Sequence, residues 1–305
     1  LNQKLKICKN KRLGFSLIEL SIVILVIGIL VVGITQGSRI LRESRLFSAR
    51  ALTTSSPVWS TTGLILWLET SLKTSFDANI STGTAISSWY DNNQLSQSKN
   101  NTSQGTPEYR PTYQENVING LPAVRFDSTN DHLIIPNFEL RNIGNRGFAI
   151  FAVVKKTQSG RGDFFSYKSL ANDDDFGLLI DTNNRVRYSL KVNSANIINF
   201  SRSFDIAITG TNFNILTFTR SEASVYNGYV NGTLGLTAAG ATNFTDINAG
   251  TSLLIGSNHL NGSFVPDLSF GGDVAEIIIF NRGLKLNERK SIEQYLAQKY
   301  RLKTS

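Results

Sequence analysis

Residues with the chemistry of catalytic groups are few and poorly spaced in this sequence. His132 and His259 are the only histidines, and neither has a metal-ligating residue two to four positions further along. Asp273 and Glu276 are three residues apart in the run DVAEIIIF, and this spacing in a regular strand predicts side chains on opposite faces. The chain has no Gly-x-Ser-x-Gly nucleophile turn and no phosphate-binding glycine loop. The pattern therefore predicts no enzyme activity.

Side chains that suit sugar binding are more numerous. Carboxylates and planar amides form hydrogen bonds to sugar hydroxyls. The candidate ligand-binding residues are Asp91, Asn92 and Asn93; Asp127, Asn130, Asp131 and His132; Asp173, Asp174 and Asp175; and Asn258 with His259. Asp173 and Asp175 also suit Ca²⁺, which takes oxygen ligands and is the one cofactor that the sequence suggests. A solvated turn is the simpler interpretation of each group, because Asn and Asp favour turns.

A further acid, Glu19, lies inside the longest apolar run, FSLIELSIVILVIGILVVGI, at residues 15–34. As a helix that rises 1.5 Å per residue, this run spans about 30 Å, the thickness of one hydrocarbon core. The run therefore predicts a transmembrane helix. The basic residues before it predict that its N-terminal end stays cytoplasmic and that residues from 36 onward lie outside. These basic residues are Lys4, Lys6, Lys9, Lys11 and Arg12.

Two simpler interpretations of this run compete with an assembly role. A secretory signal peptide has an apolar region of about 7 to 15 residues followed closely by a cleavage site. The small residues at 49–51 lie too far downstream for that. A plain signal anchor needs only length and flanking charge. It does not explain Glu19, because a carboxylate in a spanning helix costs on the order of 2 to 3 kcal/mol near the bilayer centre and less near its edge.

The residues RLGFSLIEL resemble the cleavage and methylation segment of type IV pilins and type II secretion pseudopilins. The resemblance implies that a prepilin peptidase cuts after Gly14 and methylates Phe15, and that Glu19 is the family's glutamate at the fifth mature position. The new amine at Phe15 would lie one helical turn from Glu19. Glu19 would then pair with this amine or with that of a neighbouring subunit, and so act in assembly.

The helical pattern continues beyond the membrane. Apolar and small residues recur at helical spacing from Ile40 to Leu52, with arginines largely on the other side. We therefore expect a leader at residues 1–14 and a pilin-like helix at 15–53, which is transmembrane over 15–34 and amphipathic over 36–53. Ser55-Ser56-Pro57 stops this helix and begins a linker at 54–62.

From Gly63 onward the pattern changes to many short strands. Alternating or apolar runs are separated by turns rich in Asn, Gly, Ser and Thr, without intervening helices, which favours an antiparallel β-sandwich. The runs are GLILWLET, LPAVRFD, GFAIFAVVKK, FNILTFT, ASVYNGYV, TSLLIGS and VAEIIIF. Asn231-Gly232 predicts a type I′ hairpin, and Asn183-Asn184 is a weaker signal of the same kind. Trp67 and Trp89 lie in apolar runs and are expected in the core.

The C-terminal end predicts a short helix. Asn287 can cap it, and Ile292, Tyr295, Leu296 and Tyr300 would face the sandwich, with the end near Leu302. The order of GLILWLETS, GLPAVRFDSTNDHLIIP, FAIFAVVK, YVNGTL, LLIGS and FGGDVAEIIIFNRGLKLNERKSIEQYLAQKYRL resembles the concanavalin A-like lectin/glucanase superfamily, laminin-G-like branch. The resemblance covers residues 63–302 and implies a jelly-roll sandwich at 63–305. Glucanases of this superfamily carry their acids on alternate strand residues, unlike Asp273 and Glu276.

Charge and cysteine content exclude further classes. The net charge of +8 lies almost wholly in the first 60 residues, and the remainder carries about +1. No basic stripe remains for a nucleic-acid backbone to follow, so we expect no nucleic-acid binding. Cys8 is the only cysteine, so the fold must be held by core burial without a disulfide within the chain.

Together these features predict a mainly β, pilin-like protein that is anchored in a bacterial inner membrane by a single span or associated with a filament. Its C-terminal domain would be periplasmic or displayed on the filament, where it binds glycan or protein in adhesion. The expected partners are a prepilin peptidase, other pilin or pseudopilin subunits through residues 15–53, and a glycan or surface protein through 63–305. Two alternatives stay open: a pseudopilin of a type II secretion system, and a membrane-tethered glycan hydrolase.

Overall fold

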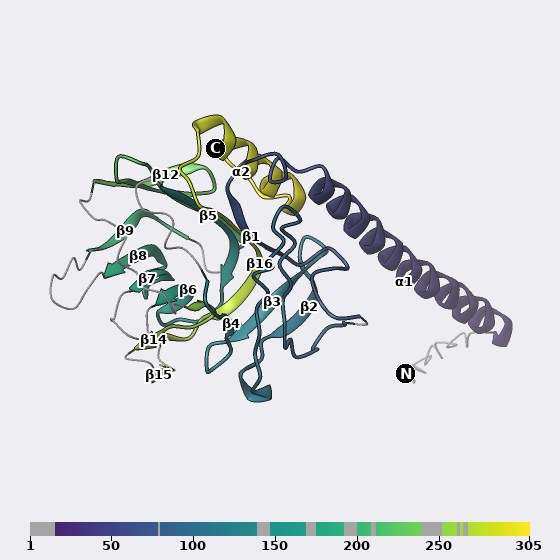
Figure 1. Cartoon of the computed structure of the whole chain (residues 1–305). Coiled ribbons are helices and arrows are strands. Elements are labelled where there is room, and N and C mark those ends of the chain that lie inside the picture. The colour runs from purple at the N-terminus through teal and green to yellow at the C-terminus, as the bar shows by residue number, and fades with distance from the viewer. Residues whose placement is uncertain are drawn as a thin grey trace, which may run out of the picture. The chain divides into compact units, whose positions relative to one another are not determined.

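The computed structural model describes residues 16–78, 80–138, 147–168, 175–191, 200–208, 212–239, 252–260, 263–264 and 268–305 (Figure 1). It divides into two compact units, Leu1–Ser44 and Arg45–Ser305. Gly14, Phe15, Asp173 and Asp174 lie outside the described residues. Asp175 is the first residue of a strand, and only its backbone is described.

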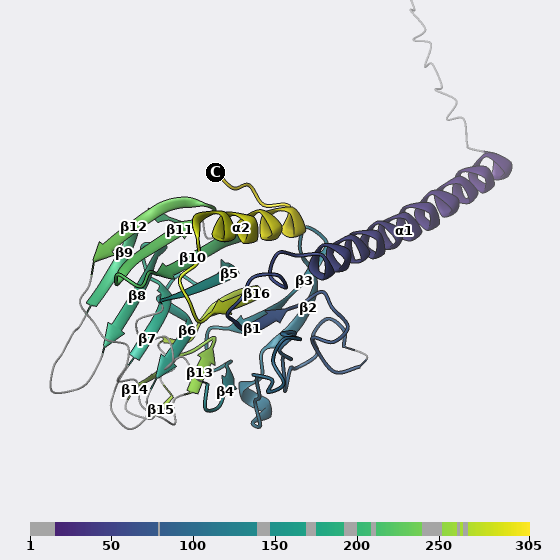
Figure 2. The same cartoon turned by 45° about the horizontal axis from the view of Figure 1, so that its top comes forward.

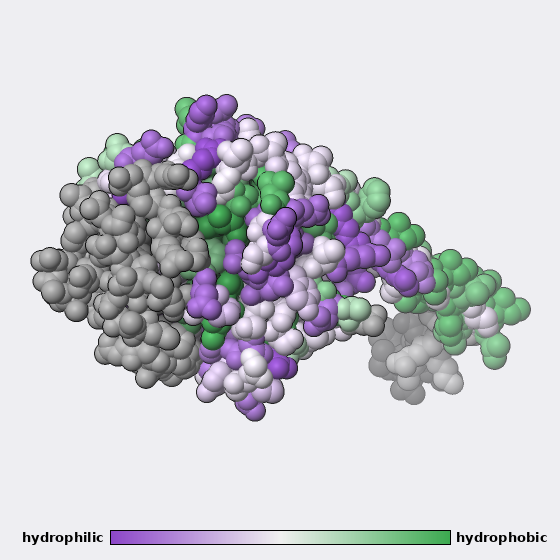
Figure 3. Space-filling view, in the orientation of Figure 1, coloured by the Kyte–Doolittle hydropathy of each residue, from purple (hydrophilic) through white to green (hydrophobic). Residues whose placement is uncertain are grey.

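Helix α1 spans Leu17–Thr54. Serine and threonine hydroxyls in the helix donate to carbonyls about one turn earlier, as Ser21 does to Leu17 at 2.7 Å, so these hydroxyls are satisfied within the helix. Apolar side chains from Leu17 to Ile34 are exposed, and this part of the helix is coloured hydrophobic in Figure 3. By its length and composition the helix can cross a membrane.

The remainder of the chain is mainly β. The elements after α1 are β1 (Leu64–Glu69), η1 (Pro107–Tyr109), β2 (Thr112–Ile118), β3 (Leu121–Asp127), β4 (Leu133–Ile135), β5 (Phe148–Lys156), β6 (Gly162–Lys168), β7 (Asp175–Ile180), β8 (Arg185–Lys191), β9 (Phe200–Ala207), β10 (Asn214–Arg220), β11 (Val225–Val230), β12 (Thr233–Ala239), β13 (Ser252–Ile255), β14 (His259–Leu260), β15 (Ser263–Phe264), β16 (Gly271–Phe280) and α2 (Leu286–Tyr300).

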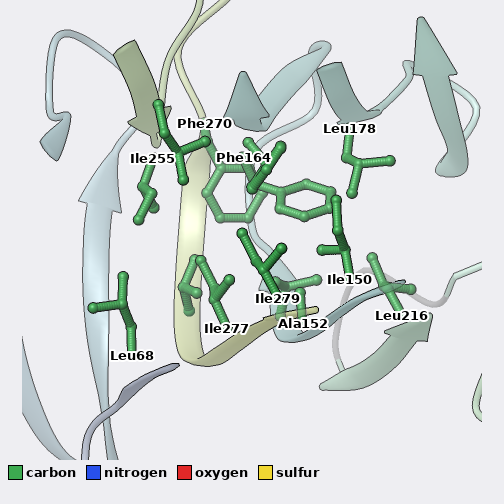
Figure 4. Close-up of a cluster of buried hydrophobic side chains, with 14 of the residues drawn as sticks. Leu68, Ile150, Ala152, Phe164, Leu178, Leu216, Ile255, Phe270, Ile277 and Ile279 are labelled. Atoms are coloured by element: carbon green, nitrogen blue, oxygen red, sulfur yellow. The ribbon is translucent and has the colours of Figure 1, made fainter. Parts of the chain in front are cut away.

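Two antiparallel sheets pack face to face (Figure 2). The first has the order β12-β11-β10-β5-β16-β3-β2, with β1 paired to the other half of β16. The second has the order β4-β13-β6-β7-β8-β9. The inward side chains alternate along each strand and meet between the sheets, as Leu68, Ile150, Phe164, Ile255 and Ile279 do in Figure 4. Each such side chain stabilises the fold by roughly 1.5 to 3 kcal/mol, and the prediction of an antiparallel sandwich is confirmed.

A second apolar cluster lies on the outer face of the first sheet. Ile292, Tyr295, Leu296 and Tyr300 of α2 are buried there, as their spacing predicted. Trp67 is also fully buried, because it alternates with the inward Leu66 and Leu68 on β1. Trp89 is buried between the sheets instead. The prediction that both tryptophans belong to the core is confirmed.

The last turns of α1 belong to the compact unit of the sandwich. Ala49 and Thr53 are buried there. Arg50 Nε donates to the carbonyl of Ser71 at 2.7 Å, and the hydroxyls of Thr53 and Tyr295 are 3.3 Å apart. The domain therefore includes helical residues that precede the linker expected at 54–62.

Two turn predictions have different outcomes. Asn231 and Gly232 both have positive φ, 50° and 81°, between β11 and β12, so the hairpin is confirmed. The expected cap of α2 is wrong, since the helix begins at Leu286 with Lys285 before it, and it ends at Tyr300. The Glu288 carboxylate accepts the backbone N–H of Lys285 at 2.7 Å, and this bond starts the helix two residues earlier than Asn287 would.

Candidate functional site

Glu19 lies in the first turn of α1, on an exposed helix. Its Oε2 accepts the backbone N–H of Ser16 at 2.8 Å, as acids do at helix N-termini. The carboxylate therefore points back toward the N-terminal end of the helix, where the expected cleavage would create an amine. The two processing residues themselves, Gly14 and Phe15, lie outside the described part of the chain.

Asp91 and Asn92 are buried, and their polar atoms make internal hydrogen bonds. Asp91 accepts backbone N–H groups of Trp67, Asn93 and Asn100 at 2.9 to 3.1 Å. Burial raises the pKa of Asp91, and these N–H groups lower it in part. Asn92 accepts the hydroxyl of Thr74 at 2.6 Å. These side chains hold the loop against β1, and their polar atoms are used within the fold.

The second predicted group forms a turn after β3. Asp127 is exposed, and its Oδ1 accepts the backbone N–H of Thr129 at 2.8 Å. Asp131 is 7% exposed, and its Oδ2 accepts the N–H of Asp127 at 3.0 Å. Burial and the charge of Asp127 raise the pKa of Asp131 to about 7. The half-buried Asn130 offers its carbonyl to Nδ1 of His132, whose pKa is lowered by burial.

The predicted Asn258 belongs to a polar network on β6 that the sequence analysis missed. Its Nδ2 donates to Asp163 at 2.8 Å, and its Oδ1 accepts the hydroxyl of Ser166 at 3.0 Å. Arg161 binds the same Asp163 with two bonds of 2.7 Å, and its side chain is 40% exposed. Arg161 directly precedes β6 and Asp163 is the second residue of that strand, so the Arg-x-Asp spacing next to an apolar run was the available signal.

The structure brings this network and the Asp127 turn to one end of the sandwich. Ser269 forms a bridge with Asp163, and its hydroxyl donates to the carbonyl of Thr129 at 3.1 Å. Carboxylate, guanidinium and amide groups of loops distant in sequence therefore gather at this end. Asp163 and Asn258 are buried and bonded to each other, so the groups that can meet the hydroxyls of a ligand here are the exposed Asp127 and the partly exposed Arg161.

The prediction that Asp273 and Glu276 face opposite sides is wrong. The register of β16 against β5 shifts between Val274 and Glu276. This β-bulge inserts Ala275, and therefore Glu276 lies opposite the outward-facing Val153 while Val274 faces inward. Asp273 and Glu276 therefore share the outer face. Asp273 accepts two bonds from Arg125, at 2.7 and 3.1 Å.

Glu276 belongs to a buried ionic cluster beneath α2. Lys299 Nζ lies 2.8 Å from both Glu276 and Glu69, and all three side chains are at most 1% exposed. Trp67, Tyr295 and Tyr300 also donate to Glu276, at 2.7 to 2.9 Å. Burial would lower the pKa of Lys299, but the two carboxylates raise it well above its usual value. These contacts give Glu276 a role in holding α2 on the sheet.

Among the described residues, no group of three or more His, Cys, Asp or Glu side chains could hold a metal ion. The Ca²⁺ hypothesis concerned Asp173 and Asp175, whose side chains are outside the described part. It stays a prediction.

Comparison with known proteins gives two family matches. Residues 127–288 match the concanavalin A-like lectin/glucanases superfamily, and residues 9–35 match the prokaryotic N-terminal methylation motif. No curated protein matches the chain. The methylation match includes Gly14, Phe15 and Glu19, and the superfamily match includes the polar end of the sandwich.

Several solved structures are similar to the chain at low sequence identity. The CBM40 of a Ruminococcus gnavus sialidase bound to α2,3-sialyllactose is 19% identical, with a TM-score of 0.43 over 48% of this chain and 81% of that chain. A heptameric pentraxin of Limulus polyphemus is 16% identical, with a TM-score of 0.43 over 56% and 79%. The HCR/D W1238A mutant is 12% identical, with a TM-score of 0.50 over 77% and 51%.

Proposed function

Since the chain belongs to the concanavalin A-like lectin/glucanase superfamily and carries the prokaryotic N-terminal methylation motif, we propose that it is a pilin-like protein that displays a lectin-like domain. The domain binds glycan or protein in surface adhesion. A single span anchors the protein in a bacterial inner membrane before assembly, with the sandwich on the periplasmic side or on a filament. Prepilin peptidase and other pilin-like subunits are its partners.

One observation carries this proposal: a helix of exposed apolar residues has an acid in its first turn. In water such a surface is unstable, so the helix needs either a bilayer or neighbouring helices around it. A bilayer alone does not favour Glu19, whereas a helix bundle that brings a new amine close does. Membrane anchor and assembly handle are thus successive states of one helix.

The surface of the sandwich domain, the head of this pilin-like protein, supports a role in binding glycan or protein. Its apolar side chains fill two clusters, one between the sheets and one beneath α2, while loops at one end of the sandwich present Asp127 and Arg161 to solvent. Such a head is larger than the usual pilin head, and a bulky head would crowd a helical array. A minor or tip subunit fits this size better than the main filament subunit.

Mass spectrometry of the mature N-terminus tests the processing step. We expect the mature chain to begin with N-methylated Phe15 when it is produced with a prepilin peptidase. The matched control is Gly14→Val, which places a branched side chain at the cut and should leave the leader attached. An intact leader in the wild-type protein, or a cut near residue 50, would contradict the pilin-like role.

A glycan array tests the head. The full chain in detergent micelles, labelled at Cys8 or at an added tag, is applied with Ca²⁺ and with a chelator. We expect binding to a restricted set of glycans. If no glycan is retained under either condition, the glycan-binding part of the proposal fails and a protein ligand is left. Hydrolysis of a polysaccharide panel by the same sample would instead favour the tethered hydrolase.

A further inference from the structure

A pocket of about 380 Å³ lies on the outer face of the first sheet, at the C-terminal end of α2. The ends of β2, β5, β10 and β11 and the residues after α2 enclose it. Its lining residues that matter most are Asn119, Lys155, Phe213, Asn231, Arg301 and Lys303.

The charge of this pocket has one sign. Lys155, Arg301 and Lys303 line it, and no carboxylate side chain does. Four other arginines of the sandwich pair with carboxylates: Arg125 with Asp273, Arg161 with Asp163, Arg282 with Glu288 and Arg289 with Glu293. Asp273 is the cross-strand neighbour of Lys155, but Arg125 already binds both its oxygens. Among the described residues, no carboxylate forms an ion pair with the three pocket cations.

The polar and aromatic groups of the pocket are held in place. Asn231 Nδ2 donates to Asn214 at 3.0 Å, and its Oδ1 accepts the N–H of Ile215 at 2.8 Å. Asn119 Nδ2 donates to the carbonyl of Tyr300 at 2.7 Å. The ammonium of Lys155 lies 6.0 Å from the centre of the Phe213 ring. A ligand therefore meets amides that are already oriented, which reduces the entropy lost on binding.

We propose that this pocket binds a carboxylated sugar of an acidic saccharide. The cations bind the carboxylate, and the second Nδ2 hydrogens of Asn119 and Asn231 bind hydroxyls. This inference rests on the proposed function, since it names a ligand class and a site for the lectin-like head. A structural reason exists for one of the cations, because the negative end of the α2 dipole favours a positive charge at Arg301. The dipole does not explain Lys155, which lies on β5.

Binding of tetragalacturonic acid to the full chain in detergent micelles tests the pocket. Isothermal titration in about 0.1 M salt compares it with the methyl ester of the same oligosaccharide, which has the same sugars without charge. We expect binding of the acid and at least about tenfold weaker binding of the ester. The double variant Arg301→Gln/Lys303→Gln should weaken binding of the acid by about tenfold or more, because it removes charge-assisted hydrogen bonds.

The control Lys73→Gln/Lys290→Gln makes the same change in net charge at two exposed lysines away from the pocket. We expect it to stay within about twofold of the wild type, as distant surface charges are screened. An equal loss in both double variants would overturn the site, and equal affinity for a pentaglutamate peptide would overturn the saccharide class. Glycan binding that neither variant changes would overturn the pocket and leave the proposed function standing. Retention of no glycan at all would overturn the pocket together with the glycan-binding part of the proposed function.

Discussion

Two acids of this protein lie in apolar surroundings, and their partners differ. Glu276 is buried beneath α2, where Lys299, Trp67, Tyr295 and Tyr300 all donate to it. Glu19 lies on the exposed apolar helix α1, where its contact is the backbone N–H of Ser16. The sandwich supplies every partner that Glu276 needs, because its donors come from β1 and α2 of the same fold.

This difference in partners indicates which property each acid affects. Removing a partner of Glu276 leaves a charge buried in the domain, so the effect must be on stability. Removing Glu19 leaves the sandwich untouched, so under the proposed function the effect must be on assembly. The variants below separate these two roles.

The largest effect should follow from Lys299→Met. This variant leaves Glu69 and Glu276 buried together without a cation, and we expect a loss of about 3 to 5 kcal/mol in the free energy of unfolding. Denaturant unfolding followed by tryptophan fluorescence measures it, since Trp67 contacts Glu276. The matched control is Lys290→Met on the exposed side of the same helix, which should change stability by less than about 0.5 kcal/mol.

A smaller effect of a different kind is expected for Glu19→Ala. The sandwich should unfold at the same denaturant concentration, and membrane insertion should be unchanged or slightly better. Incorporation into filaments, measured by immunoblot of sheared filaments against total membrane protein, should fall about tenfold or more, as expected for a lost buried ion pair. Glu43→Ala on the same helix is the control, because its exposed pair with Arg39 contributes little. Unchanged incorporation of Glu19→Ala would contradict the pairing role.

The smallest effect concerns Asp131, an acid with a backbone donor and no cation in its described contacts. Its pKa of about 7 in the folded state exceeds the unfolded value near 3.9. The unfolded chain loses the proton first as pH rises, so stability falls between about pH 4 and pH 7. Asp131→Asn should therefore raise the free energy of unfolding by about 1 kcal/mol at pH 8 and leave it unchanged at pH 3.5. Denaturant unfolding at both pH values measures this, and an equal change at both would contradict it.

Predictions from the sequence were accurate where the interactions are local in the chain, and they failed where distant segments interact. LPAVRFD became β3 without a shift, because its alternation and the flanking turns are local. The hairpin at Asn231-Gly232 followed from two residues with positive φ. The face of Glu276 was missed, because a bulge depends on the register of a neighbouring strand. Asn287 was the better cap by type, but the Glu288 carboxylate accepts the N–H of Lys285 and so starts the helix two residues earlier.

The polar groups show the same limit. Asp91 looked like a ligand residue by type, and only the packed structure shows that three backbone N–H groups occupy it. The pocket with Lys155 and Arg301 could not be predicted, because its residues come from three strands, the turns beside them and the residues after α2.

The sequence alone determined the membrane-length helix, the place of Glu19 in its first turn, the class of the sandwich and the amphipathic face of α2. These features depend on periodicity and on residues close together in the chain. Only the tertiary structure decided which acids are free to meet a partner. The burial and hydrogen bonds of an acid depend on residues that are far away in the chain. Glu69 and Lys299, for example, lie 2.8 Å apart in the fold, and a local sequence pattern cannot predict such a contact.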